Sequence, residues 1–273
     1  MYEHAESLID EWPDWGVALP GRPTVLEQVA HSETNEIYQI HTGERNLALR
    51  IFNPSTNHDL DRLQEIRIHR HAAQIGVAPA LLYCDPQLRY ALIDWIPAEP
   101  PITSDSAQID KVINCVQRYQ SSDISALALQ PYPYVEKLES YISTALQSQS
   151  QRISSLAAFE KEGARAIKTL EHYEANFGHR RCLTHNDLNA HNVLWHHQTH
   201  PSPCVIIDWE FAGLGIASLD LAGLITEFDL EPDSSQLSQY CKNMAIGQDE
   251  LEQALQCYSL LCSYYRFSML QNE

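Results

Sequence analysis

The stretch CLTHNDLNAHNVLW, residues 182–195, gathers histidines, asparagines and one aspartate between two apolar ends. Within it, His185, Asp187 and Asn192 form the pattern H-x-D-x-x-x-x-N. The apolar run VII then brings Asp208 to the end of a predicted strand, 21 residues after Asp187. Such a stretch is typical of an active-site loop, a metal site or a polar surface loop, and the rest of the chain decides among them.

Phosphoryl transfer needs the kinds of side chain that these positions provide. When a phosphoryl group moves to a hydroxyl, one carboxylate accepts the hydroxyl proton, while an amide oxygen and a second carboxylate hold Mg²⁺ on the phosphates. Asp187, Asn192 and Asp208 supply these groups in the order of the protein-kinase-like fold. We therefore expect Asp187 to be the catalytic residue, and Asn192 and Asp208 to be metal ligands.

A histidine-rich metal site is a weaker alternative. His196, His197 and His200 follow His185 and His191 in the sequence. These residues lie across a predicted strand and turn rather than at helical ligand spacing, and no CxxC pair joins them, so zinc is disfavoured. We expect His185 to be a structural brace for the catalytic loop, whereas for His191 loop packing and a phosphate contact both stay open.

Two charged residues upstream complete the kinase-like pattern. The sequence predicts strands at 24–29, 36–41 and 47–52, followed by a helix at 59–75. Arg50 lies on the third strand, and Glu65 lies on the apolar face of the helix. Because an arginine forks, it can bind Glu65 and a phosphate oxygen together. We expect an ion pair in which Glu65 orients Arg50 toward the phosphates of ATP.

The order of the elements predicts an α+β fold of two lobes, as in the protein kinases. Two short apolar segments at 80–84 and 90–96 follow the predicted helix, and then comes the proline-rich stretch PAEPPITS. Long helical patterns occupy most of the remaining chain. We expect a small N-lobe with an antiparallel sheet over residues 1–95 and a larger, mainly helical C-lobe over residues 96–273.

Composition narrows the classes of partner. The formal charge of −18 repels nucleic acid and anionic lipid and favours cationic partners, although the same acids also keep a protein soluble. Seven cysteines without a CxxC pair are typical of reduced thiols in a cytoplasmic protein. The N-terminal residues MYEHAESLID predict no signal peptide, and no apolar run reaches the roughly 20 residues that span a bilayer. We expect a cytoplasmic protein without membrane insertion, whose oligomeric state the sequence does not fix.

The runs HNDLNAHN and IDWEFAGLGIASLDLA resemble the aminoglycoside phosphotransferase and choline kinase superfamily, the small-molecule branch of the kinase-like fold. The Asp-Trp-Glu run at 208–210, the arginine on the third strand and the hinge DWIP are similar to its choline kinase and thiamine kinase members. The resemblance implies a phosphotransferase that uses ATP and two Mg²⁺ ions to phosphorylate the hydroxyl group of a small metabolite. Thiamine and choline share a cationic head that suits the acidic chain, and an aminoglycoside or a sugar is the alternative.

The resemblance also implies residues that bind the nucleotide. Thr34 and Asn35 match the Thr/Ser-Asn of the family's first hairpin. Residues 93–96, which include Ile93 and Trp95, would meet adenine through backbone groups. Arg50 and Glu65 would serve the phosphates as described above.

Residues for the acceptor substrate are expected downstream. Glu210, two residues past the metal-binding Asp208, is the candidate contact for a cationic substrate. Tyr258 and Tyr265 would belong to an aromatic cage for its cationic group, although an aromatic stripe at helical spacing is also typical of plain core. Asp220, in SLDLAGL, is expected to start a helix or to anchor a loop rather than to bind a ligand.

The first hairpin departs from the family. Its sequence VAHSETNEIY has no glycine, where family members use glycine to bring backbone N–H groups over the phosphates, and Glu33 adds a negative charge. A stiffer, acidic hairpin should grip triphosphate less well, through geometry and through repulsion. A catalytically weak or inactive, pseudokinase-type binding module is therefore the alternative from another class.

Overall fold

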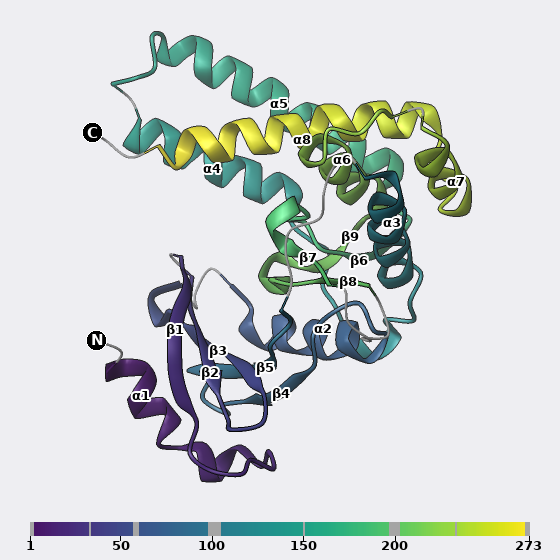
Figure 1. Ribbon diagram of the computed structural model, residues 1–273. Helices are drawn as coiled ribbons and strands as arrows, with labels where there is room; N and C mark the ends of the chain where they lie inside the picture. Colours follow the sequence, from purple (N-terminus) through teal and green to yellow (C-terminus); the bar gives the residue numbers. More distant parts are fainter. Residues whose placement is uncertain are drawn as a thin grey trace. The chain divides into compact units, whose positions relative to one another are not determined.

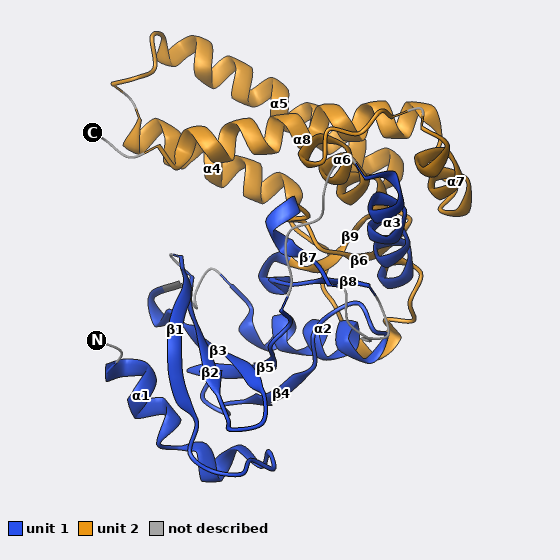
Figure 2. Ribbon diagram, viewed as in Figure 1, with its two compact units in different colours: residues 1–119, 190–211 blue, residues 120–189, 212–273 orange. Residues whose placement is uncertain are grey.

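The computed structural model describes residues 3–32, 34–56, 60–97, 105–149, 151–196, 203–232 and 234–270. The chain divides into two compact units, coloured separately in Figure 2: Met1–Tyr119 with Ala190–Phe211, and Gln120–Asn189 with Ala212–Glu273. The first unit holds an antiparallel sheet and the second is mainly helical, which confirms the predicted α+β class. Neither unit is one continuous segment, so they do not test the predicted lobes 1–95 and 96–273, which stay a proposal.

An antiparallel sheet of five strands forms the centre of the first unit (Figure 1). Its strands lie in the order β1-β2-β3-β5-β4. Their bounds are β1 Thr24–His31, β2 Asn35–His41, β3 Asn46–Phe52, β4 Leu81–Cys84 and β5 Tyr90–Asp94. In β3, Leu47, Leu49 and Ile51 are buried in the main apolar cluster of the unit. Because side chains alternate along a strand, Arg50 and Phe52 point to the other face.

Helices cover the two faces of this sheet. The apolar cluster on the first face includes residues of α1 (Glu3–Ile9) and Trp15 of the short helix η1 (Trp12–Trp15). On the second face, α2 (Arg62–Gln74) begins at Asp61, whose side chain accepts the N–H of Gln64 at 2.9 Å. Glu65 is buried with the apolar residues of α2, as the sequence predicted, so a charged residue lies on the inward face of this helix.

A short hairpin completes the first unit and carries the predicted metal ligands. It consists of β7 (Val193–Trp195) and β8 (Cys204–Ile206), flanked by the single turns η4 (Ala190–Asn192) and η5 (Trp209–Phe211). The N–H of Ile206 donates to the carbonyl of Val77 at 2.7 Å, which joins the hairpin to the segment after α2. Trp209 packs edge-on against Tyr119 of α3 (Ser106–Gln120), with 5.3 Å between ring centroids. These contacts fix the chain on both sides of Asp208.

The second unit is built on helices that pack around one apolar cluster. Its long helices are α4 (Tyr134–Ser148), α5 (Leu156–Phe177) and α8 (Gln248–Ser268), with the shorter α6 (Ala217–Glu227) and α7 (Ser235–Asn243). Leu138, Leu170, Tyr173 and Ala254 are among its buried core residues. A two-stranded ladder of β6 (Arg181–Thr184) and β9 (Gly213–Ile216) lies in this unit and was not predicted. In the described part of the chain, no helix is both long and apolar enough to cross a membrane.

Candidate active site

Arg50 of β3 lies at the centre of a group of carboxylates in the first unit. Its Nη1 donates to Glu65 Oε1 at 2.5 Å, and its Nη2 donates to Asp208 Oδ1 at 2.8 Å and Glu210 Oε2 at 3.1 Å. Burial opposes the charge of the guanidinium, but the three carboxylates outweigh it and raise the pKa of Arg50. Arg50 is therefore charged at every physiological pH. The predicted pair of Arg50 and Glu65 is present in the structure.

A second buried arginine, Arg62 at the start of α2, shares these carboxylates. Its Nη1 donates to Glu65 Oε2 at 2.7 Å and to Glu210 Oε2 at 3.2 Å, and its Nη2 donates to the Thr34 carbonyl at 2.9 Å. The guanidinium lies over the Phe52 ring, 4.8 Å from its centroid. Sequence reasoning missed this residue, although its position three residues before Glu65 places both side chains on one side of a helix.

Glu210 is enclosed by donors from three separate segments. Besides Arg50 and Arg62, Thr34 Oγ1 donates to its Oε1 at 3.1 Å, and Asn35 Nδ2 donates to its Oε2 at 2.8 Å. The side chain of Glu210 is 5% exposed, whereas that of Asp208 is 36% exposed. Of the two acids, Asp208 is therefore the one open to a ligand. The structure brings Thr34, Asn35, Arg50 and Glu65 together around Glu210.

Asp208 and Asn192 occupy neighbouring positions on the β7–β8 hairpin. The N–H of Ile207, the residue before Asp208, donates to the Asn192 carbonyl at 2.9 Å. This bond brings the backbones of Asn192 and Asp208 close together at the end of the hairpin. Asp208 has a φ of 64°, a left-handed conformation that aspartate and asparagine adopt more readily than most residues. This turn directs the chain from β8 into η5 directly after the carboxylate.

The residues present fit a divalent cation at Asp208. Carboxylate oxygens of Glu65, Asp208 and Glu210 lie within 4.8 Å of one another. Two of these acids already accept hydrogen bonds from both arginines, whereas Asp208 accepts from Arg50 and is the most exposed. An amide and a carboxylate oxygen are the ligands that Mg²⁺ prefers. Asp208 is therefore the acid that such an ion would reach, while Glu65 and Glu210 stay in their ion pairs.

Arg50 also has a hydrogen-bond donor that its neighbours leave unused. Among the described residues, its buried Nε–H has no hydrogen-bond partner, and neither does the Oδ1 atom of Asn35. A buried donor without a partner is costly, and it is expected where a ligand completes the site. If a cation drew the Asp208 carboxylate away, the Nη2 atom of Arg50 would also become available to donate to an anion.

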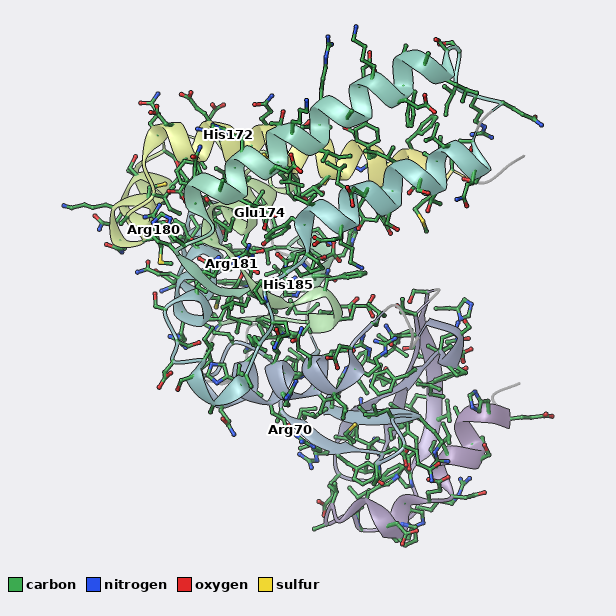
Figure 3. All side chains as sticks on the ribbon, turned by 180° about the vertical axis from the view of Figure 1, so that it is seen from behind. Arg70, His172, Glu174, Arg180, Arg181 and His185 are labelled. Carbon is green, nitrogen blue, oxygen red and sulfur yellow. The ribbon has the colours of Figure 1, made fainter. Side chains whose placement is uncertain are left out.

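The predicted catalytic loop lies in the second unit and is held by Asp220. The carboxylate of Asp220 accepts the N–H of His185 and the N–H of Asn186, both at 2.8 Å, so its predicted role as a loop anchor is confirmed. His185, labelled in Figure 3, is fully buried at the end of β6. Asn186 has a φ of 63°, and its Oδ1 accepts the Tyr134 hydroxyl at 2.8 Å. Asp187 follows directly and is half-buried.

Tyrosines of the second unit lie within the electrostatic reach of Asp187. Burial raises the pKa of Tyr141 to about 12, and Tyr265, Cys262 and the charge of Asp187 add to this effect. Burial likewise raises the pKa of Tyr132 well above its usual value, again with a contribution from Asp187. Tyr141 and Tyr265 meet edge to face with 5.2 Å between centroids. Tyr132 and Tyr141 are therefore neutral phenols within reach of a carboxylate.

The remaining predicted residues have different surroundings. Tyr258 donates its hydroxyl to Glu227 at 3.2 Å and is partly buried in the helical core, whereas Tyr265 is 44% exposed. Ile93 lies in β5 opposite Ala48, and Trp95 is half-buried just after the strand. Glu33, His197 and His200 lie outside the described residues. No motif singled out Tyr132 and Tyr141, on whose pKa values the charge of Asp187 acts.

Residues 25–253 match the sequence model of the phosphotransferase enzyme family, so the chain belongs to this family. This match confirms the superfamily predicted from the motifs, and it makes the protein a phosphotransferase. A comparison with curated protein sequences gives no match.

Solved structures of small-molecule kinases share the fold. The choline kinase LicA from Streptococcus pneumoniae has a TM-score of 0.71 at 16% identity, over 97% of this chain and 90% of that one. The Plasmodium vivax ethanolamine kinase has a TM-score of 0.69 at 11% identity, over 100% of this chain and 84% of that one. An aminoglycoside-3'-phosphotransferase of type VIII has a TM-score of 0.61 at 17% identity, over 93% and 98%. These similarities confirm the predicted kinase-like fold; LicA has also been solved in complex with AMP.

Proposed function

We propose that this phosphotransferase moves the γ-phosphoryl group of ATP to the hydroxyl group of a small cationic metabolite, of the kind represented by thiamine and choline, with Mg²⁺ as cofactor. Membership of the phosphotransferase enzyme family supports the reaction class. The AMP complex of LicA supports an adenine nucleotide as donor. The formal charge of −18 favours a cationic acceptor.

The observation that carries the proposal is the state of Arg50. It is a buried, permanently charged group, oriented by Glu65, with an Nε–H that has no partner among the described residues. Such a group is suited to bind an anion in a fixed direction. In the proposed reaction Arg50 binds the phosphates, Thr34 and Asn35 border them, and residues 93–96, including Ile93 and Trp95, meet adenine through backbone groups.

Asn192 and Asp208 would hold the metal, as part of the two-ion arrangement that the family resemblance implies. When bound, Mg²⁺ neutralises charge on the phosphate oxygens. Asp187 would accept the proton of the substrate hydroxyl through its carboxylate. His185 and Asp220 keep the backbone before Asp187 fixed, so that little reorganisation is needed during proton transfer.

The surroundings of Asp187 support the proposed acceptor class. Tyr132 and Tyr141 lie within the electrostatic reach of this carboxylate, Tyr141 meets Tyr265 edge to face, and aromatic faces attract a cationic head. Tyr258 remains a weaker candidate because its hydroxyl already contacts Glu227. The hydroxyethyl arm and cationic head of thiamine and choline match a carboxylate beside an aromatic wall.

A substrate panel tests the proposal. Purified protein is incubated with Mg-ATP and, separately, with thiamine, choline, ethanolamine, an aminoglycoside and a neutral sugar, and ADP release is measured. We expect turnover with a cationic alcohol, and loss of turnover when EDTA removes the metal. Turnover with the neutral sugar alone would refute the cationic acceptor, while turnover that is indifferent to EDTA would refute the metal.

The glycine-free first hairpin favours a second candidate, a binding module with weak or no catalysis. Calorimetry with Mg-ATP separates the two functions. The kinase predicts saturable binding, whereas a titration without heat at millimolar nucleotide would refute the nucleotide site and leave the binding module.

A further inference from the structure

The turn between β1 and β2 is held rigid by its own polar groups. Ser32 donates its N–H to the Asn35 carbonyl at 2.9 Å, and Ser32 Oγ accepts the Asn35 N–H at 3.1 Å. Asn35 Nδ2 also donates to Thr34 Oγ1 at 2.8 Å. These bonds close the turn without the conformational freedom that glycine gives to a glycine-rich loop. Its position has to be set by what it contacts.

Arg62 and Glu210 contact this turn from two sides. Arg62 binds the backbone carbonyl of Thr34 at 2.9 Å, and Glu210 accepts the side chains of Thr34 and Asn35 at 3.1 and 2.8 Å. Arg62 and Glu210 are themselves paired at 3.2 Å. The turn, the start of α2 and the segment after Asp208 therefore form one hydrogen-bonded group within the first unit.

Arg62 also balances the charges around Arg50. Glu65, Asp208 and Glu210 carry three negative charges, and Arg50 and Arg62 carry two positive ones. Without Arg62, Arg50 would be the only cation among the described residues that is paired with Glu65 and Glu210, in addition to its own bond to Asp208. Carboxylates would then hold the sides of the Arg50 guanidinium that a phosphate has to reach.

We infer that Arg62 is a positioning residue for the phosphate site. It fixes the glycine-free turn through the Thr34 carbonyl, and it neutralises Glu210 and one oxygen of Glu65 so that Arg50 can leave Asp208 and bind phosphate. Glu210 then serves as the partner that joins Arg62 to the turn, rather than as the contact for a cationic acceptor that the sequence suggested. The inference rests on the proposed function only in taking the anion to be a nucleotide phosphate.

The substitution Arg62→Met removes the charge and the fork but keeps an apolar stem over Phe52. Its matched control is Arg70→Met on the exposed side of the same helix (Arg70 is labelled in Figure 3). We expect Arg62→Met to raise the KM for ATP on the order of tenfold, while the KM for the acceptor changes less than about twofold. Arg62→Lys should recover part of the loss because it keeps the charge but not the fork. Equal increases in both KM values, or an unchanged KM for ATP, would overturn the inference.

Hydrogen–deuterium exchange provides a readout that needs no nucleotide. In the ligand-free protein, Arg62→Met should speed the exchange of the peptide that covers the turn, while Arg70→Met leaves it unchanged. Thr34→Val removes the bond to Glu210 together with the contacts of Thr34 Oγ1 to Ser32 and Asn35. It is the variant to use if Arg62→Met does not fold, and it should also speed the exchange of the same peptide. Unchanged exchange in the folded variants refutes the positioning role even if ATP binds. If Arg62→Met speeds exchange but the wild type does not bind ATP, the nucleotide site is refuted. The role of Arg62 in fixing the turn would still hold.

Discussion

The two units hold their candidate functional residues by different means. In the first unit, Arg50, Arg62, Glu65 and Glu210 are charged side chains that are paired with one another. In the second unit, the loop before Asp187 is fixed by backbone N–H groups that donate to the single carboxylate of Asp220. One region is thus a set of exchangeable ion pairs, and the other is a backbone fixed to a buried acid.

The difference matches two chemical tasks. A site that admits a polyanion and a cation has to exchange its internal pairs for ligand contacts, and paired arginines and carboxylates can do so without leaving a buried charge unpaired. A residue that accepts a proton has to be in place beforehand, because misplacement costs rate directly. We therefore expect substitutions in the first unit to act on nucleotide affinity and substitutions in the second to act on the rate of the chemical step.

The largest effect is expected for Asp187→Asn. The amide keeps the size of the side chain but cannot accept the hydroxyl proton, so kcat should fall by about 10³-fold. Nucleotide affinity, measured by calorimetry, should stay within about threefold of the wild-type value because Asp187 is not assigned to the phosphates. The exposed substitution Asp249→Asn controls for the change in charge. A large loss of nucleotide affinity would contradict the assignment of nucleotide binding to the first unit and of the chemical step to the second.

Asp220→Asn should have the next largest effect. The amide presents one carbonyl oxygen where the carboxylate serves two N–H groups and Gln120, so one buried donor loses its partner, at a cost of about 2 kcal/mol. The loosened loop should lower kcat by about 10²-fold, with little change in the KM for ATP. Thermal unfolding and steady-state kinetics measure both effects. If the KM for ATP alone changes, the second unit is not the part that sets the chemical step.

A neutral histidine beneath the charged group of the first unit predicts a dependence of stability on pH. Burial lowers the pKa of His69 to about 4, although its bond to the Pro79 carbonyl and the charge of Glu65 raise it; Arg50 and Arg70 lower it further. Since the unfolded chain binds a proton near pH 6.5 and the folded one does not until about pH 4, stability is full above pH 6.5 and falls as the pH decreases toward 4.

Urea unfolding at pH 7.5 and pH 5.0 measures this contribution. Between these values the wild type should lose about 2 kcal/mol more than His69→Gln, which retains a donor for Pro79 but does not titrate. His172 is exposed on α5 of the second unit, so His172→Gln is the matched control and should behave as the wild type. Equal losses for wild type and His69→Gln would show that His69 is not held neutral.

The sequence predicted the parts of the molecule that are local or ordered along the chain. Periodicity placed Arg50 on β3 and Glu65 on the apolar face of α2, and the kinase-like pattern predicted that they pair; the structure contains that pair. The order of Asp187, Asn192 and Asp208, with the runs around them, was sufficient to predict the family. The β6–β9 ladder was missed because its four-residue strands are too short for a periodic pattern.

Contacts between distant segments were beyond the reach of the sequence. Arg62 reads as a solvated residue at the start of a helix, and its burial depends on Glu210, 148 residues away. Glu210 itself was assigned to the substrate by its distance from Asp208, whereas its donors come from Thr34, Asn35, Arg50 and Arg62. Periodicity reports which face of an element is buried, but it does not report which other segment satisfies a buried charge.

The smallest effect, and the finest test of the comparison, is expected for Phe52→Leu. The Phe52 ring lies 5.5 Å from the guanidinium carbon of Arg50 and 4.8 Å from that of Arg62, so it contacts both cations of the first unit. Loss of the ring removes two cation–π contacts of about 0.5–1 kcal/mol each and should raise the KM for ATP by about threefold, with kcat unchanged. Ile51→Val trims the opposite face of the same strand and costs about 1 kcal/mol of stability without touching either arginine. If both variants raise the KM for ATP equally, the effect comes from the packing of β3. The ion pairs of the first unit would then depend on the apolar core, which contradicts the comparison of the two units.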